Sequence, residues 1–477
     1  MSDFKPARNH ETLGDTFYDR VAAADFPPTI LRHRDQRWAA RMGLDTLSQD
    51  QWLAHFGRFT PLPGSLPEPL ALRYHGHQFR SYNPDLGDGR GFLFAQGFDL
   101  EDNRLLDFGT KGTGRTPWSR GGDGRLTLKG GVREVLASEM LEAMGVYTSK
   151  SFSLVETGES LQRGDEPSPT RSAALVRLSH SHIRIGSFQR LAYLEDTAGL
   201  QHLLDYAIAT YYPALADATD RPAAFLAAVV AEVARLGAQY TAAGFVHGVL
   251  NTDNINITGE SFDYGPWRFI PSYDPGFTAA YFDETGLYSF GRQPDALAWN
   301  LTRLAECLVP LSSIETLEPA LNTVWPVFRA ELPRQMLRRL GLTPRGVELD
   351  GAFVTTLFEF LAASQAPYEQ FLFDWRGGVL STQRAAASPS AQAYTSESFR
   401  PVADALEAYQ PSDDVNLEHA YFARQRPRTM LIDEVEAIWT PIAERDDWTL
   451  LEETLEEIGQ MRQAYGEAGA GAGGDTR

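Results

Sequence analysis

Three side chains in one short segment have the types and spacing that a metal-dependent, hydroxyl-activating site needs. The segment spans residues 245–266 and reads FVHGVLNTDNINITGESFDYGP. The carboxylate of Asp253 can accept the proton of an attacking hydroxyl group. The side-chain oxygens of Asn254 and Asp263 are ligands of the kind that Mg²⁺ and Mn²⁺ prefer. The segment is therefore a candidate catalytic centre.

The spacing within this segment resembles the catalytic and metal-binding loops of kinase-like phosphotransferases. Where such a catalytic loop reads His-Gly-Asp, the Asp accepts the hydroxyl proton and an Asn five residues later holds magnesium. Here His247-Gly248 is followed by Val249, which cannot accept a proton, while Asn254 keeps the metal-ligand spacing. Asp263-Tyr264-Gly265 stands where a metal-binding Asp-Phe-Gly element is expected. We infer that the metal site is retained, and that Asp253 could serve as a relocated base if the nucleotide lay differently in the cleft.

A second group of residues, upstream, could supply the other half of a nucleotide cleft. Lys111 follows a β-like run, and Glu134 stands near the start of a helix predicted over 132–144. They resemble the strand lysine and helix glutamate whose ion pair orients nucleotide phosphates in kinases, although two solvated surface charges would be the default interpretation of any such pair alone. Glycine-rich segments at 86–90 and 112–125 could bring backbone amides close to phosphate, or could simply form tight turns.

Basic residues gather around these segments even though the whole chain is acidic. Arg177 and Arg184 are seven residues apart around a turn, which suits bidentate binding of phosphate oxygens. Four histidines are interpreted as polar turn residues, because no Cys or third ligand lies at metal-site spacing. The basic residues of the island are Arg90, Lys111, Arg115, Arg120, Arg125, Lys129, Arg133, Arg177 and Arg184, and the histidines are His75, His77, His180 and His182.

Composition limits the kinds of partner. The 477 residues carry a formal net charge of -20, which argues against nonspecific nucleic-acid binding and against an anionic membrane surface. The most apolar window, 223–238, is interrupted by Glu232 and Arg235, so a soluble, cytoplasmic protein is expected, and we expect a monomer. The single cysteine, Cys307, excludes an intramolecular disulfide and is predicted to be a buried thiol on a helix.

The order of predicted elements indicates an α+β fold with two lobes, like a protein kinase. Short β-like runs and one helix make up a small β-rich N-lobe over 66–195, and helices dominate a larger C-lobe over 196–384. An N-terminal extension over 1–65 and a C-terminal helical extension over 385–465 flank the lobes, and a flexible tail is predicted over 466–477. Within the C-terminal extension, the Ser-, Pro- and Ala-rich stretch 385–415 is predicted to be a surface excursion.

Taken together, these motifs resemble the selenoprotein O family, kinase-fold proteins once classed as pseudokinases and now regarded as protein adenylyltransferases. The matching segments follow the family's order over about half of the chain, and such a set is far more specific than any one glycine motif. They are Gly-His-Gln-Phe at 76–79, Tyr-Asn-Pro-Asp-Leu-Gly-Asp-Gly-Arg at 82–90, Lys-Gly-Thr-Gly-Arg-Thr-Pro-Trp-Ser-Arg at 111–120, Gly-Asp-Gly-Arg at 122–125, Arg133-Glu134, Ser181-His182-Ile183-Arg184, Asn-Thr-Asp-Asn at 251–254 and Asp-Tyr-Gly-Pro at 263–266.

The resemblance implies a nucleotide bound in reverse, with the α-phosphate of ATP facing a substrate hydroxyl. On that reading Asp253 accepts the hydroxyl proton, Asn254 and Asp263 hold Mg²⁺ or Mn²⁺, and AMP passes to Ser, Thr or Tyr side chains of other proteins as pyrophosphate leaves. Glu134 would orient Lys111. The residues implied to line the nucleotide pocket are Gly87, Gly89, Arg90, Lys111, Asp123, Gly124, Arg177 and Arg184, with Asp263 beside them.

Some features depart from the family pattern, and alternatives stay open. The chain has no cysteine near its C-terminus, so redox control by such a residue is not expected. Transfer of UMP from UTP with manganese is a variant of the same reaction, because no feature of the sequence indicates which nucleobase is bound. A kinase that transfers the γ-phosphate with another base would leave Val249 unexplained. A noncatalytic nucleotide-binding scaffold would not need Lys111, Glu134, Asn254 and Asp263 together.

Overall fold

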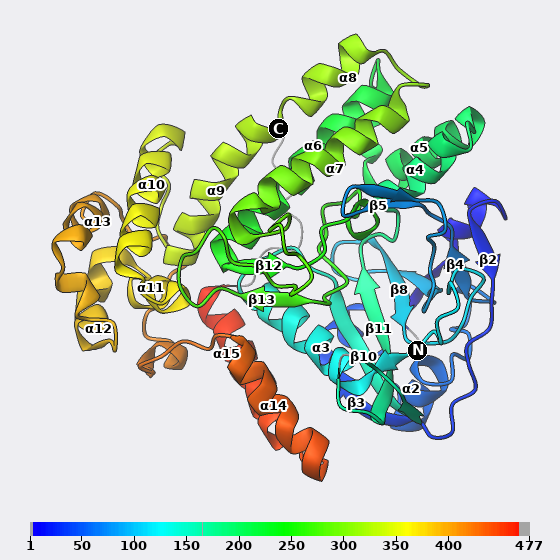
Figure 1. Ribbon diagram of the computed structural model, residues 1–477, viewed down its shortest axis with the longest axis horizontal. Helices are drawn as coiled ribbons and strands as arrows, with labels where there is room; N and C mark the ends of the chain where they lie inside the picture. Colours follow the sequence, from blue (N-terminus) through cyan, green and yellow to red (C-terminus); the bar gives the residue numbers. More distant parts are fainter. Residues whose placement is uncertain (1–2, 165, 467–477) are drawn as a thin grey trace.

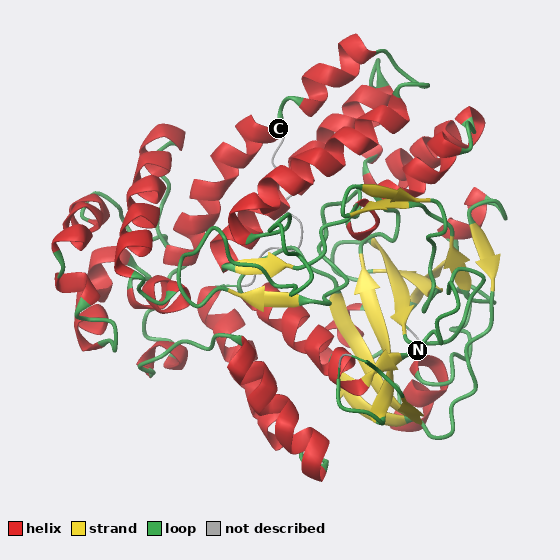
Figure 2. Cartoon of the chain, in the orientation of Figure 1, coloured by secondary structure: helices red, strands yellow, loops and turns green. Residues whose placement is uncertain are grey.

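The computed structural model of this chain describes residues 3–164 and 166–466, and the predicted tail over 466–477 lies almost wholly outside them. Its strands gather in one lobe and most of its helices in the other (Figure 2). The smaller lobe is built on a nine-stranded sheet with the order β2-β4-β7-β8-β11-β10-β3, to which β1 adds beside β7 and β9 beside β11. The strands are β1 (Lys5–Ala7), β2 (Tyr18–Arg20), β3 (Ile30–Arg34), β4 (Leu70–Leu72), β7 (Leu93–Phe98), β8 (Leu105–Lys111), β9 (Leu126–Thr127), β10 (Lys150–Leu161) and β11 (Thr170–Ser179).

Helices cover the two faces of this sheet. Helices α1 (Gln36–Arg41) and α2 (Gln49–Phe56) lie on one face, where an aromatic core gathers around Trp52, Phe108 and Phe152. Helix α3 (Leu128–Ala143) covers the other face and joins the main core of the molecule. Because side chains alternate along a strand, Leu175 of β11 belongs to the main core while Val176 belongs to the aromatic core.

The N-terminal residues are part of this sheet. All of its strand pairs are antiparallel, and β1, β2 and β3 pair with β7, β4 and β10. The predicted N-terminal extension therefore adds strands to the β-rich lobe, and the boundary at residue 65 remains a prediction. Two small hairpins lie outside the main sheet. They are β5 (Gly76–Gln78) with β6 (Ser81–Asn83), and β12 (Phe245–His247) with β13 (Trp267–Phe269).

The helical lobe is arranged around α6 (Arg221–Ala243), which packs against α7, α8 and α9 (Figure 1). Residues typical of helix ends stand at both ends of α6. The side chain of Asp220 accepts a hydrogen bond from the backbone amide of Ala223, and Gly244 ends the helix in the left-handed conformation. The remaining helices of this lobe are α4 (Ile185–Tyr193), α5 (Thr197–Tyr211), α7 (Gln293–Leu308), α8 (Ile314–Leu321), α9 (Val324–Leu340), α10 (Val347–Ser364) and α11 (Tyr368–Asp374).

The C-terminal region holds α12 (Thr382–Ala387), α13 (Arg400–Leu406), α14 (Ile432–Arg445) and α15 (Thr449–Tyr465). The prediction of a surface excursion over 385–415 is wrong in part. Phe399, Val402 and Leu406 are buried in a second core formed with α9, α10 and α11. They are spaced at helical intervals of three and four residues, a signal hidden by the surrounding Ser, Pro and Ala.

Two further expectations concern burial. Cys307 lies on α7 and is buried, which confirms the predicted buried thiol, and burial raises the pKa of this thiol to about 12. Within the described residues, α6 alone is long and apolar enough to cross a membrane, and 56% of its most apolar window is already buried inside the protein. A buried core helix meets the same criteria of length and composition.

Candidate active site

Lys111, at the end of β8, makes contact with two carboxylates. Its Nζ is hydrogen-bonded to Oε1 of Glu134 on α3 and lies 2.6 Å from Oδ1 of Asp263. Lys111 is 4% exposed and Glu134 is 2% exposed. A buried ammonium needs such partners, because it loses its hydration on burial. The lysine–glutamate contact expected from the sequence is present, and it places Asp263 beside the pair.

Asp263 is surrounded by positive charge. Its Oδ1 accepts a hydrogen bond of 3.1 Å from Nη1 of Arg177, and Arg90 lies close enough to act on it electrostatically. Burial disfavours the charged carboxylate, but Lys111, Arg177 and Arg90 outweigh burial and hold the pKa of Asp263 well below its usual range. The strand β11 and the loop after β6 thus bring two arginines to the lysine site.

Arg177 and Arg184 share an aromatic support. Their guanidinium carbons lie 5.4 and 4.9 Å from the ring centre of Phe262, the residue before Asp263. Tyr74 lies against Arg184 at 4.3 Å, so this guanidinium contacts two rings. Stacking of this kind fixes the plane of a guanidinium while leaving N–H groups available. The structure therefore positions both arginines beside the segment that carries Asp263.

The catalytic loop is held to the Asp263 segment through His247. The backbone amide of Val249 donates to Nδ1 of His247, so the ring proton lies on Nε2, which donates to the carbonyl oxygen of Phe262 at 3.1 Å. Asn254 donates from Nδ2 to the carbonyl oxygen of Val249 at 2.9 Å. No described residue donates a hydrogen bond to Oδ1 of Asn254, which leaves that oxygen available to a cation.

Asp253 lies in a short 3₁₀ turn over Thr252–Asn254 and is only 8% exposed. Burial raises the pKa of its carboxyl to about 6, although the nearby Arg184 opposes the shift. Nη1 of Arg184 donates to the backbone oxygen of Asp253 at 3.0 Å. The side-chain Oδ1 of Asp253 is buried and has no hydrogen-bond partner among the described residues. A buried carboxylate oxygen without a partner is the kind of group that a bound hydroxyl can satisfy.

The hairpin β5–β6 covers the catalytic loop, which the sequence argument did not anticipate. The backbone amide of His77 donates to Oγ1 of Thr252 at 2.7 Å, and that of Phe79 donates to Oδ1 of Asn251 at 3.1 Å. Gly76 lies so close that a Cβ added to it would be 3.0 Å from Oδ1 of Asp253. The Gly-His-Gln-Phe motif at 76–79 was the available signal, and its role is to hold the loop that carries Asp253.

The two glycine-rich segments pack closely against each other. Oγ1 of Thr116 donates to the carbonyl oxygen of Asp88 at 2.6 Å, and a Cβ added to Gly87 would lie 2.4 Å from the ring of Trp118. A Cβ added to Gly89 would lie 2.8 Å from the carbonyl oxygen of the same tryptophan. Both glycines are therefore required for the close contact of the two segments. The alternative interpretation of the glycines as residues of tight turns does not account for this contact.

Asp88, between these glycines, is a site residue that sequence reasoning missed. Its Oδ1 accepts a hydrogen bond of 3.2 Å from Nη2 of Arg184, and its Oδ2 accepts one of 3.1 Å from the backbone amide of Leu72. It therefore links the glycine segment to the arginine that contacts Asp253. The repeated Gly-Asp-Gly pattern was the only sequence signal for it.

Replacing Gly87 by alanine is expected to lower the free energy of unfolding by about 1–3 kcal/mol, because the added methyl group overlaps the ring of Trp118. Thermal unfolding measures the effect. Gly164→Ala is the matched control, because no neighbouring atom of the described residues lies within 4 Å of a Cβ at that glycine. Equal stability of the two variants would contradict the proposed packing.

The structure does not bring every predicted residue to the lysine. Asp123 is paired with Arg163 at 2.8 Å, and its Oδ1 accepts from the backbone amide of Arg125. Gly124 has a φ of 69°, and a Cβ there would lie 2.1 Å from the carbonyl oxygen of Gly114. These two residues shape the glycine loop. Lys111 contacts Glu134 and Asp263, Asp263 also contacts Arg177, and Arg184 contacts the backbone of Asp253.

The residues present fit a hard divalent cation held together with a nucleotide. Asn254 and Asp263 offer oxygen atoms, and oxygen ligands with phosphate are what Mg²⁺ and Mn²⁺ take in nucleotide sites. Among the residues that the structure describes, no group of three or more His, Cys, Asp or Glu could hold a metal ion. A cation here would need phosphate oxygens to complete its coordination.

The histidines that could have suggested another metal site have protein partners instead. Nδ1 of His75 lies 2.8 Å from the hydroxyl of Tyr82, and Nδ1 of His180 lies 2.6 Å from the hydroxyl of Tyr147. His77 contacts the side chain of Gln189, and buried His182 contacts Asp107. Their interpretation as polar structural residues agrees with these contacts, although His77 lies in β5 and not in a turn.

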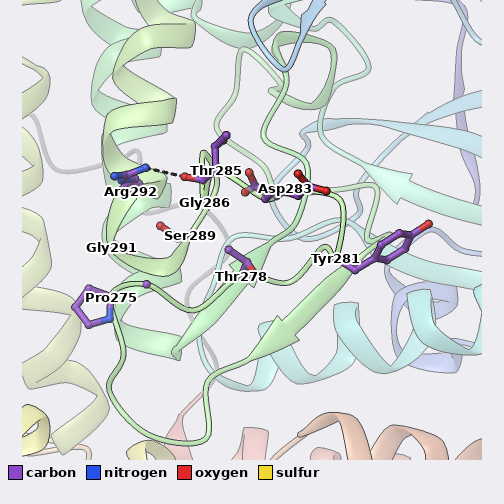
Figure 3. Close-up of a pocket in the computed structure, with 11 residues that line it drawn as sticks. Pro275, Thr278, Tyr281, Asp283, Thr285, Gly286, Ser289, Gly291 and Arg292 are labelled. Atoms are coloured by element: carbon purple, nitrogen blue, oxygen red, sulfur yellow. Dashed lines mark hydrogen bonds between the residues drawn. The ribbon is translucent and has the colours of Figure 1, made fainter.

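A hollow of about 700 Å³ lies in the loop that follows the Asp263 segment (Figure 3). Arg292 donates to the carbonyl oxygen of Thr285 at 3.0 Å, and both oxygens of Asp283 accept backbone hydrogen bonds. The loop is joined to the catalytic loop by Tyr288, whose hydroxyl donates to Oδ1 of Asn251 at 2.6 Å. In Figure 3 the side chain of Tyr281 extends away from the Arg292 end, and it is 87% exposed.

The two lobes, the buried Lys111–Glu134 pair and the loop ahead of Asp263 define a protein-kinase-like fold, with these residues gathered between its β-rich and helical parts. A sequence model described as "Protein adenylyltransferase SelO" matches residues 2–459. The chain therefore belongs to the SelO family of protein nucleotidyltransferases.

Curated relatives agree with this assignment. A protein from Gloeobacter violaceus named protein nucleotidyltransferase YdiU is 46% identical, over 97% of this chain and 95% of its own length. One of the same name from Trichormus variabilis is 43% identical, over 94% of this chain and 93% of its own length. Among solved structures, Toxoplasma gondii ROP2, described as a virulence factor with a protein-kinase fold and no enzymatic activity, covers 68% of this chain and 99% of its own at 13% identity. Its TM-score of 0.28 is too low to support an argument.

Proposed function

We propose that this protein transfers AMP from ATP to hydroxyl groups of Ser, Thr or Tyr side chains in other proteins and releases pyrophosphate. The observation that supports it best is the buried, unpartnered Oδ1 of Asp253 beside Asn254, in a loop where Val249 stands in place of the usual kinase base. A base displaced along the loop suits attack on a different phosphorus atom. The SelO family assignment supports the same class of reaction.

Each residue then has a definite task in the transfer. The acceptor hydroxyl oxygen forms a bond to the α-phosphorus, its proton passes to Asp253, and the bond from the α-phosphorus to the bridging oxygen breaks. Lys111, Arg177 and Arg90 would hold the phosphates and stabilise charge on the departing pyrophosphate. Asn254 and Asp263 would hold Mg²⁺ or Mn²⁺, which supplies further charge neutralisation when bound.

Mass spectrometry of labelled acceptor proteins tests this proposal. The purified protein is incubated with ATP or with UTP, in magnesium or in manganese, together with a cell extract of its source. The proposal expects acceptors heavier by one AMP group in the ATP reactions. Acceptors heavier by one UMP group in the reaction with UTP and manganese would show that the protein transfers UMP instead of AMP. Acceptors heavier by one phosphate group would show that it is a kinase. Nucleotide binding without any addition would favour the noncatalytic scaffold.

The exposed aromatic residues near the catalytic loop are proposed to contact the protein acceptor. The ring centres of Tyr281 and Phe282 lie 5.2 Å apart, and those of Phe282 and Phe79 lie 5.9 Å apart. The backbone amide of Phe79 donates a hydrogen bond to Asn251 of the catalytic loop. The double variant Tyr281→Ala, Phe282→Ala is expected to raise KM for acceptor peptides by about tenfold or more, as loss of aromatic anchors does. The KM for ATP should not change.

Initial rates on a peptide library centred on Ser, Thr or Tyr measure this effect. Ile314→Ala removes an exposed apolar side chain from α8 and serves as the matched control. An unchanged KM for peptides in the aromatic double variant would show that acceptors bind elsewhere.

A further inference from the structure

Helix α3, which carries Glu134, begins with a turn that is weakened by two glycines, although Thr127 caps it. Gly130 and Gly131 occupy this turn, and each glycine weakens a helix by about 1 kcal/mol relative to alanine. Gly131 is required there, because a Cβ would lie 2.5 Å from Cδ1 of Leu154. The position of Glu134 therefore depends on contacts that α3 makes with other elements.

The C-terminal helices supply some of these contacts, and others come from Arg37 and Trp38 of α1, which bind Glu142. Nζ of Lys129, in the weak first turn, lies 2.7 Å from Oε2 of Glu436 on α14. Nη2 of Arg462, on α15, is bonded to Glu139 and lies 3.2 Å from Oε2 of Glu142, both on α3. The Arg462 side chain is itself largely buried in this contact.

Glu134 and Glu139, one of the two α3 partners of Arg462, lie on different sides of α3. Five residues separate Glu134 from Glu139, which is roughly 140° around the helix axis. Ser138, on the side of Glu134, donates to Oγ of Ser151 in β10 at 2.8 Å. The sheet and α15 thus both pack against α3. Apolar residues of α14 and α15 join the same core as those of α3.

We propose that α14 and α15 hold α3 in the position where Glu134 reaches Lys111, and that Arg462 is the main positioning residue. The consequence for the site follows from the two carboxylates on Lys111. If α3 moves away, Lys111 keeps only Asp263, 2.6 Å away, and this ion pair then competes with nucleotide phosphate and metal for both residues. The C-terminal helices thereby control the affinity for the nucleotide from outside the cleft.

The inference rests on the proposed function only for the identity of the nucleotide. Its test therefore measures ATP binding as well as nucleotidyl transfer. Arg462→Met removes the charge and keeps the apolar stem, and Glu134→Gln removes the partner of Lys111. The affinity for ATP with magnesium is measured by calorimetry in the wild type, in both single variants and in the double variant. Transfer from α-labelled ATP is measured in parallel.

Arg462→Met is expected to weaken ATP binding by about tenfold in the wild-type background, within the range of mutations that act through a coupled element. In the Glu134→Gln background the same change should have an effect of less than about twofold, since the pair through which it acts is already lost. Arg462→Lys should restore most of the affinity. Amide hydrogen exchange over 128–143 should be faster in Arg462→Met.

Arg428→Met is the matched control, because Arg428 pairs with Glu457 of α15 and has no ion pair with α3. It should lower thermal stability to a similar degree and leave ATP affinity within about twofold. An equal loss of affinity from Arg462→Met in both backgrounds would overturn the inference, since a purely structural contact acts independently of Glu134. If Arg462→Met weakens ATP binding only when Glu134 is present, but no variant transfers label to protein, the proposed function would be contradicted and this inference would stand.

Discussion

Replacing Asp253 by asparagine is expected to lower the rate of transfer by about 10²–10⁴-fold, the usual contribution of a positioned general base. Asparagine has the shape of aspartate and fits beside Gly76, where a larger side chain would not, so the loop should keep its structure. The amide cannot take the hydroxyl proton. ATP binding should change little, because the carboxylate of Asp253 makes no bond to Lys111 or Arg177 in the described structure.

Single-turnover rates with α-labelled ATP separate the chemical step from binding. Measured beside them, the ATP affinity of Asp253→Asn serves as the internal control for correct folding. Transfer within a factor of about ten of the wild type would remove Asp253 as the base. A loss of ATP affinity equal to the loss of rate would instead assign it to nucleotide binding.

Replacing Asp263 by asparagine is expected to abolish both metal-dependent ATP binding and transfer, with a loss of at least about 10³-fold in rate. The change removes a negative oxygen ligand and also the charge that balances Lys111 and Arg177. Asparagine is preferred to alanine here because Asp263 has a φ of 65°, a left-handed conformation that Asn tolerates well. The loss is therefore expected from chemistry and not from a strained backbone.

Titration of Mg²⁺ and Mn²⁺ in the presence of ATP measures the first effect. A chelator added to the wild type should reproduce the loss of transfer, and added cation should restore it in the wild type alone. Retained metal dependence in Asp263→Asn, with an unchanged cation affinity, would place the metal ligand elsewhere.

Much of this site could be predicted because its residues lie in local motifs. Lys111, Glu134, Asn254 and Asp263 follow spacings set by a strand, a helix and two short loops, and such spacings survive as sequence patterns. The main helices were also recognisable, since α6 carries both an apolar stripe and signals at each end.

Other parts were set by contacts between distant segments, for which one sequence holds little signal. Asp88 gains its role from Arg184, ninety-six residues away. The hairpin β5–β6 gains its role from Asn251 and Thr252, and Arg462 from Glu139. The burial of 399–406 was missed because small polar residues around Phe399 masked the helical period.

The most direct test of nucleotidyl transfer is a parallel reaction with ATP labelled at the α- or at the γ-phosphate, followed by tracing of the label into protein. We expect label in protein from the α-position only, with labelled pyrophosphate released from γ-labelled ATP, and no label in protein with the Asp263→Asn variant. Label in protein from the γ-position alone would contradict nucleotidyl transfer and define a kinase with an unidentified base, because Val249 cannot accept a proton.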